Sequence, residues 1–166
     1  MSDDILLYDT EESLKIQKSP EPELVIEKFT LVPDSDPVLR KQLPLFDFEN
    51  PPVDPNAFAS SLVETCKQYN GLGLSANQCG FLHRVFVMGA GDNYVAHFNP
   101  KVINAYGEVH MDEGCLSFPL LYLKITRPLQ IDVEYQDFNG ITRTATYNGI
   151  SARCFLHELE IGRAHV

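Results

Sequence analysis

The chain has 166 residues, 44% of them hydrophobic and 10% aromatic, which is typical of a single globular domain. Its 13 Lys and Arg stand against 23 Asp and Glu, and the formal net charge of −10 argues against nucleic-acid or membrane partners, since phosphate binding depends on clustered basic side chains. No apolar run approaches the ~20 residues of a membrane span. Acidic Asp3 and Asp4 stand where an export signal is basic, so we expect a cytoplasmic protein.

The first segment, residues 1–30, is predicted to be an acidic, loosely ordered N-terminal arm, because eight acidic side chains face only three basic ones. Prolines then recur over residues 33–55, and each removes a backbone donor and restricts φ. This pattern predicts an extended surface segment, with Leu45, Phe46 and Phe48 as its anchors.

A helix is predicted at about residues 54–70. Asp54 is a good N-cap, Pro55 suits the first helical position, and Asn70-Gly71 supplies a stop. One apolar face recurs at helical spacing, formed by Phe58, Leu62, Val63, Cys66 and Tyr69.

Strands dominate the second half. Apolar runs at 85–88 and 94–98, the alternation at 131–135 and a turn signal at 138–140 predict strands and a hairpin. His97, within one of these runs, is expected at the surface or core edge. A second helix is predicted after Gly149 from the spacing of Ala152, Phe155 and Leu159. We therefore expect an α+β fold, with mixed or antiparallel β-sheets around a C-terminal helix.

The first segment that carries chemistry is 71–78, Gly-Leu-Gly-Leu-Ser-Ala-Asn-Gln. It fits a dinucleotide-binding glycine pattern, but that pattern needs a strand before it and a helix after it, and here a helix precedes it. Two readings stay open at this point. The glycines serve a plain turn, or they let the backbone approach a ligand, with the Gln78 amide as a donor.

The second segment is Glu113-Gly114-Cys115-Leu116-Ser117, and the third is His157-Glu158. Cysteine is often a small buried apolar residue, but beside glycine it also suits a thiolate ligand or nucleophile. In a metal-binding helix, H-E-x-x-H places two imidazoles on one face. Here Ile161 occupies the second position.

Together, in this order and spacing, the three segments resemble the motifs of the peptide deformylase family. The family pattern G-x-G-L-A-A-x-Q matches 71–78 apart from Ser75, and E-G-C-L-S matches 113–117 completely. H-E-x-D-H matches at His157 and Glu158 but departs at Glu160 and Ile161. The resemblance covers residues 31–160, which we expect to form the deformylase domain.

The resemblance implies hydrolysis of the N-formyl group from formyl-methionyl nascent peptides, with release of formate. It implies that Cys115 and His157 hold one Fe²⁺ per chain, with Zn²⁺ or Ni²⁺ as alternatives. Glu158 would be the general base, and Gln78 with the Leu116 backbone N–H would stabilise the oxyanion. The implied substrate-binding residues, and the apolar lining we expect near them, are Gly71, Leu72, Gly73, Leu74, Gly114, Ile125 and Phe155.

The resemblance also implies that Glu160 pairs with Arg127. A ribosome contact is a further expected partner interaction.

Ile161 leaves alternatives open, because isoleucine cannot ligate a metal. One alternative is a catalytically impaired, deformylase-like binding domain, and another is a thiol hydrolase that uses Cys115 and His157. Residues 161–166 read as the translation of a common sequencing adapter, so we expect them to be a foreign or artefactual tail.

Overall fold

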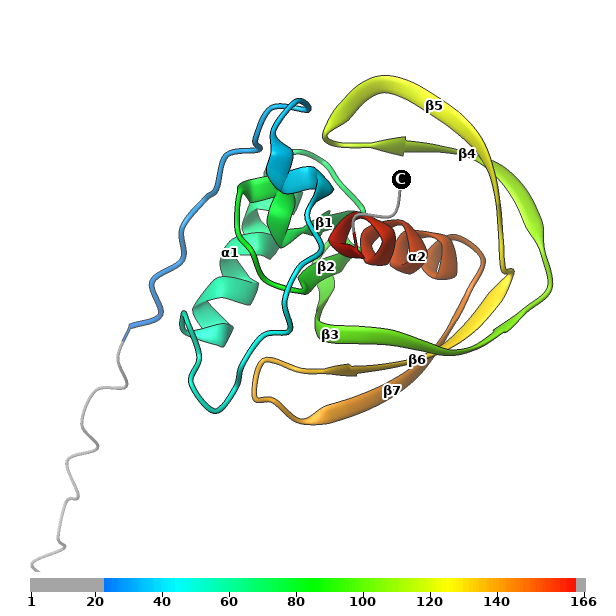
Figure 1. Cartoon of the computed structure of the whole chain (residues 1–166). Helices are drawn as coiled ribbons and strands as arrows, with labels where there is room; N and C mark the ends of the chain where they lie inside the picture. The colour runs from blue at the N-terminus through cyan, green and yellow to red at the C-terminus, as the bar shows by residue number, and fades with distance from the viewer. Residues whose placement is uncertain (1–22, 164–166) are drawn as a thin grey trace, which may run out of the picture.

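The computed structural model describes residues 23–163 (Figure 1). Within them the helices are α1 (Pro55–Gln68) and α2 (Gly149–Arg163), with short 3₁₀ helices η1 (Pro37–Arg40) and η2 (Ala76–Cys79). The strands are β1 (Gly73–Ser75), β2 (Val85–Ala90), β3 (Asn93–Tyr106), β4 (Val109–Cys115), β5 (Phe118–Arg127), β6 (Gln130–Gln136) and β7 (Thr142–Asn148). The predicted α+β fold and both predicted helices are confirmed.

The strands form two separate sheets. One is antiparallel, with the order β1-β2-β3-β6-β7, and the other is the hairpin of β4 and β5. The hairpin is an insertion between β3 and β6, which pair with each other from Phe98 opposite Gln136 to Tyr106 opposite Gln130. In Figure 1 the hairpin arches over one side of α2, while β6 and β7 lie on the other side.

Helix α1 begins as the sequence predicts. The Asp54 side chain accepts a hydrogen bond of 2.7 Å from the Ala57 N–H, and Pro55 occupies the first turn. Phe58, Leu62 and Cys66 are buried and join a core with β1 and β2. Burial of this apolar face, more than helix propensity, stabilises the helix.

Helix α2 packs on the other part of the main sheet. Its Ala152, Phe155 and Leu159 are buried against Phe86 of β2 and Ile131 of β6. The three residues recur at helical spacing, so one face of α2 enters the core. The opposite face of α2 lies toward the β4–β5 hairpin.

His97 is a core residue, not the surface or core-edge residue that was expected. It lies on β3, fully buried, and stacks on Phe86 with ring centroids 4.9 Å apart. Its Nε2 is 2.8 Å from the Tyr147 hydroxyl. Burial lowers the pKa of His97 to about 3, so the imidazole is neutral and packs as an aromatic ring.

The proline-rich segment is anchored by a different set of side chains from the three predicted, since Val38 and Leu43 are also buried. Phe46 is buried and its backbone N–H donates to the Asn99 side chain at 2.7 Å, and Phe48 packs beside it. Leu45 is 63% exposed, so its prediction as an anchor is wrong. Leu43 and Phe46 both enter the core, and Leu45 between them is directed to the surface.

Residues 27–31 run along α1 through a ladder of hydroxyl groups. The backbone N–H of Glu27 donates to Ser61 Oγ at 2.9 Å, that of Phe29 to Thr65 Oγ1 at 2.8 Å, and that of Leu31 to Tyr69 Oη at 3.5 Å. Two residues of extended chain span ~6.6 Å and four residues of helix ~6 Å, so the two repeats match.

The ladder bears on the predicted N-terminal arm. The arm lies mostly outside the described residues, but its last part, including Phe29, contacts α1 and the rings of Phe58 and Phe81. The proposed boundary at residue 30 stays a prediction. Neither helix of residues 23–163 is both long and apolar enough to cross a membrane.

The ladder makes a prediction about stability. Thr65 is fully buried, and its hydroxyl also donates to the Ser61 carbonyl at 2.7 Å. We expect Thr65→Val, which keeps the shape, to lower the free energy of unfolding by ~1–3 kcal/mol, because the Phe29 N–H loses its acceptor. Urea denaturation measures this. Thr144→Val on exposed β7 is the matched control, and equal losses in both variants would contradict the ladder.

Candidate functional site

A cavity of about 670 Å³ lies between three segments that are far apart in the sequence. Residues 70–73 form one wall, the hairpin residues 111–116 and 118–122 form another, and α2 contributes side chains from Ile150 to Glu158. All three motif segments therefore meet at one place, as the resemblance requires.

The hairpin tip brings Cys115 to the cavity. Cys115 pairs with Phe118 across a tight turn formed by Leu116 and Ser117. A Cβ at Gly71 would lie only 2.7 Å from Leu116 Cδ1, so the loop before β1 packs directly on this tip. Glycine at position 71 permits that approach.

His157 of α2 meets Cys115 and the Glu113 carboxylate. Its Nδ1 lies 3.2 Å from Glu113 Oε2, and its ring also contacts the Cys115 thiol. Burial would lower the pKa of His157, but the contacts with Cys115 and Glu113 raise it to about 10. A thiol and an imidazole from separate elements thus converge at the cavity.

Glu158 lies beside this pair and is almost completely buried. Its Oε2 accepts a hydrogen bond of 2.8 Å from the Ser75 hydroxyl of β1. Burial raises the pKa of Glu158, although His157 and the Ser75 hydrogen bond oppose the shift. Ser75 is the residue that departs from the family pattern, and here it orients the carboxylate.

Gln78 of η2 lies behind Cys115. Its Oε1 accepts from the Ser75 N–H at 2.9 Å, which fixes the amide orientation. Its Nε2 then donates to Ser117 Oγ at 3.0 Å and lies 3.6 Å from Cys115 Sγ. The amide is therefore positioned next to the thiol.

Glu113 is held by two arginines besides His157. Arg127 Nη2 donates to Glu113 Oε2 at 2.8 Å, and Arg153 Nη1 donates to Oε1 at 2.6 Å. Burial would raise the pKa of Glu113, but the hydrogen bonds from His157 and the arginines lower it to about 2. Arg127 Nη1 also donates to Glu160 Oε1 at 2.8 Å, so the predicted pairing of Glu160 with Arg127 is present.

Most of the predicted site residues line the cavity. They are Gly71, Leu72, Gly73, Gly114, Cys115, Leu116, His157 and Glu158. Leu74 does not line the cavity, because its side chain is fully buried in the core, so its prediction as a substrate contact is corrected. Phe155 likewise belongs to the core, and Ile125 is outside the lining.

Sequence reasoning missed the roles of Glu113, Ser75 and Arg153. Glu113 stands in a recognised motif, and its position two residues before Cys115 was the available signal. Ser75 was visible as a departure from the family pattern. Arg153 carried no signal, because its partners are 28 to 44 residues away.

The donors at the cavity fit a divalent metal in part. Thiolate and imidazole are ligand types of zinc, iron and nickel, and the Glu113 carboxylate is placed to orient the His157 ring. Residues 23–163 contain no group of three or more His, Cys, Asp or Glu positioned to hold a metal. Cys115 and His157 are thus two candidate ligands only, and Ile161 stands one helical turn after His157.

A family model for polypeptide deformylase matches residues 28–162. The chain belongs to this family. The peptide deformylase of Thermotoga petrophila is 37% identical over 127 residues, which cover 75% of this chain and 76% of that protein. Peptide deformylase 2 of Clostridium acetobutylicum is 38% identical over 91 residues, 55% of this chain and 61% of that protein.

Solved structures agree with the family assignment. The crystal structure of the Thermotoga maritima deformylase matches with a TM-score of 0.76 and 32% identity, over 84% of this chain and 95% of that chain. The deformylase of Synechococcus elongatus, solved in complex with actinonin, matches with a TM-score of 0.77 and 26% identity, over 84% and 81%. The family predicted from the motifs is confirmed.

The close approach at Gly73 makes a prediction. A Cβ there would lie 2.6 Å from Glu158 Oε1 and 2.9 Å from Cys154 Sγ. We expect Gly73→Ala to lower the free energy of unfolding by ~1–3 kcal/mol, because a buried carboxylate must move. Urea denaturation measures the change. Gly162→Ala, where the nearest atom would be 3.8 Å away, is the control. An unchanged Gly73→Ala protein would contradict this geometry.

Proposed function

We propose that this deformylase hydrolyses the formyl group of formyl-methionyl peptides in the cavity described above. The reaction consumes one water and releases formate and a free amino terminus. The observation that carries the proposal is the convergence of Cys115, His157 and Glu158 at one cavity, from a hairpin tip and a helix.

The proposed metal ligands are Cys115 and His157, which would hold one ion per chain. Fe²⁺ is proposed first, with Zn²⁺ and Ni²⁺ as alternatives, because a mixed thiolate and imidazole set suits all three. When bound, such a metal supplies Lewis-acid activation of water and of the formyl oxygen.

The proposed catalytic roles of the protein side chains and backbone groups are based on their positions. Glu158 accepts a proton from the attacking water and later delivers it to the leaving amine, and burial raises its pKa above that of an ordinary glutamate, which strengthens it as a base. The Gln78 Nε2 and the Leu116 backbone N–H donate to the oxygen on which negative charge develops. Ser75 holds the Glu158 carboxylate in place.

The proposed substrate lies extended between residues 71–73 and the hairpin tip. Gly71, Gly73 and Gly114 line the cavity beside its backbone, and the strand edges offer hydrogen bonds. Leu72 and the apolar hairpin side chains surround the methionine side chain. Because the substrate is a nascent peptide, the proposal extends to a cytoplasmic location and to contact with the ribosome, without direct nucleic-acid binding.

The test is formate release from a formyl-methionyl tripeptide by the Fe²⁺-loaded chain. We expect Glu158→Gln to lower kcat by ~10²–10⁴-fold, the range of general acid–base catalysis. Glu134→Gln, at a surface ion pair with Lys101, is the matched control. We expect a strong chelator to abolish turnover. Full activity in the chelator, together with loss on thiol alkylation, would instead identify a thiol hydrolase.

Position 161 provides a second test, on metal binding alone. An imidazole at this position would share a face of α2 with His157, four residues earlier. We expect Ile161→His to raise the affinity for Co²⁺ or Fe²⁺ by roughly tenfold or more, since a third ligand completes the set. Metal content after dialysis measures this, with Ile161→Leu as control. Equal retention by all three proteins would refute the ligand assignment.

The origin of residues 161–166 remains a separate proposal. We propose that they form a foreign tail on a domain spanning 31–160. Sequencing the source DNA across these codons tests it, and codons unrelated to the adapter would refute it.

A further inference from the structure

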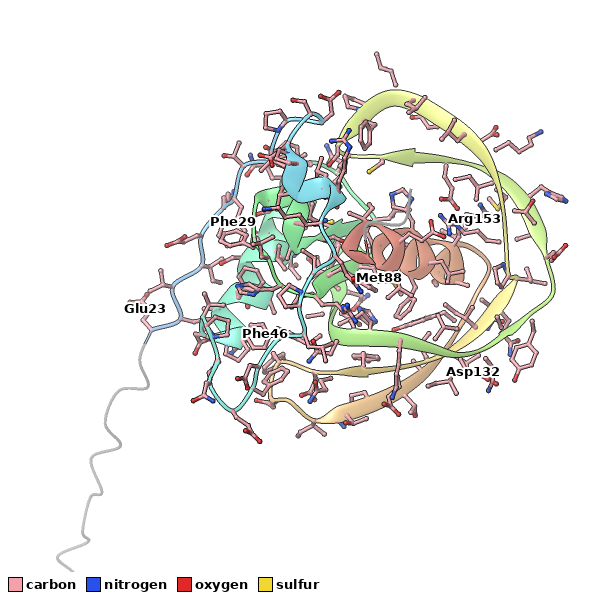
Figure 2. All side chains as sticks on the ribbon, viewed as in Figure 1. Glu23, Phe29, Phe46, Met88, Asp132 and Arg153 are labelled. Carbon is pink, nitrogen blue, oxygen red and sulfur yellow. The ribbon has the colours of Figure 1, made fainter. Side chains whose placement is uncertain are left out.

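Arg153 lies between α2 and the base of the β4–β5 hairpin, where Figure 2 labels it. Its side chain is 7% exposed and reaches both strands. Nη2 donates to the Val109 carbonyl of β4 at 2.7 Å, and Nη1 donates to the Ile125 carbonyl of β5 at 3.0 Å. Nη1 also donates to Glu113 at 2.6 Å. One guanidinium thus joins α2 to both strands of the hairpin.

The spacing of the residues on α2 supports this connection. Arg153, His157 and Glu160 stand at i, i+4 and i+7, so they share one face of the helix. All three contact the charged pair formed by Glu113 and Arg127 of the hairpin. The face of α2 that carries the motif imidazole is therefore also the face that holds the hairpin.

The chemistry of Arg153 points to a geometric role more than to a stabilising one. Its Nε is buried without a hydrogen-bond partner. Burying a guanidinium is costly, and replacing a buried ion pair with apolar side chains often leaves stability unchanged or higher. A planar fork does, however, fix direction in a way that an apolar side chain cannot.

The hairpin is held at a second point, its tip. There Gln78 donates to Ser117 and lies next to Cys115. The strands between tip and base form a wall of the cavity, with Met111, Leu121 and Tyr122. These three side chains are exposed, and none of them belongs to either hydrophobic core of residues 23–163.

We propose that Arg153 is a positioning residue that holds the wall of the cavity in place, by fixing the base of the hairpin to α2. The inference rests on the proposed function for its kinetic consequence. Because Gln78 holds the tip independently, loss of Arg153 moves the wall more than it moves Cys115. Substrate binding is therefore affected more than the chemical step.

The test compares Arg153→Met and Arg153→Lys with Arg143→Met, a surface arginine of β7 paired with Asp137. In Arg153→Met we expect amide hydrogen exchange in 109–127 to accelerate by about tenfold or more, while amides of β2 keep their rates. We expect KM for a formyl-methionyl tripeptide to rise about tenfold with kcat changed less than about threefold. Arg153→Lys should recover part of both effects, and Arg143→Met should show neither.

Several results would overturn the proposal. If the hairpin amides of Arg153→Met exchange at wild-type rates, Arg153 does not hold the hairpin. If the amides of β2 accelerate equally, the effect of Arg153 is not specific to the hairpin. An unchanged KM shows that the wall does not depend on it. Should Arg153→Met fail to fold, Arg153→Lys carries the same comparisons. Failure of the proposed function can be told apart from failure of this proposal. In the first case the wild-type chain releases no formate, while hydrogen exchange still tests whether Arg153 holds the hairpin.

Discussion

A single buried carboxylate, that of Glu113, joins the two parts of the molecule that form the site. It accepts hydrogen bonds from Arg127 on its own hairpin and from Arg153 and His157 on α2. Three donors around one anion keep it ionised in a place where burial alone would favour its neutral form. Without this anion, two arginines and an imidazole would face one another in a buried junction, so the position of the hairpin depends on it.

The main sheet and the hairpin contribute differently to the site. The sheet carries β1, whose Gly73 and Ser75 surround Glu158, and it is stabilised by buried apolar side chains on both helices. The hairpin has little apolar burial along β5 and is held by hydrogen bonds and ion pairs. A well-packed core thus fixes the Glu158 carboxylate, a polar junction fixes the cavity wall, and Gln78 holds the hairpin tip that carries the Cys115 thiol.

The elements predicted from sequence were those with local signals. Helix α1 follows from Asp54, Pro55 and an apolar repeat, and β6 follows from the alternation of Ile131 and Val133. The hairpin strands β4 and β5 were not predicted, since β5 is exposed along most of its length and has no buried face to impose a pattern. His97 and Leu45 were placed wrongly because burial depends on what packs opposite, which a single segment does not contain.

The sequence by itself determined the family and the fold class and supplied the candidate residues of the site, because the three motif segments are short and each of their positions is restricted by chemistry. The tertiary structure alone decided how these residues meet. In the folded chain Leu74 is buried in the core, Ser75 lies next to Glu158, and Arg153 donates to carbonyl groups of a hairpin that is distant in the sequence. The physical reason is range: a cap or an apolar repeat acts over a few residues, whereas these contacts join segments 28 to 83 residues apart and form only when the whole chain has packed.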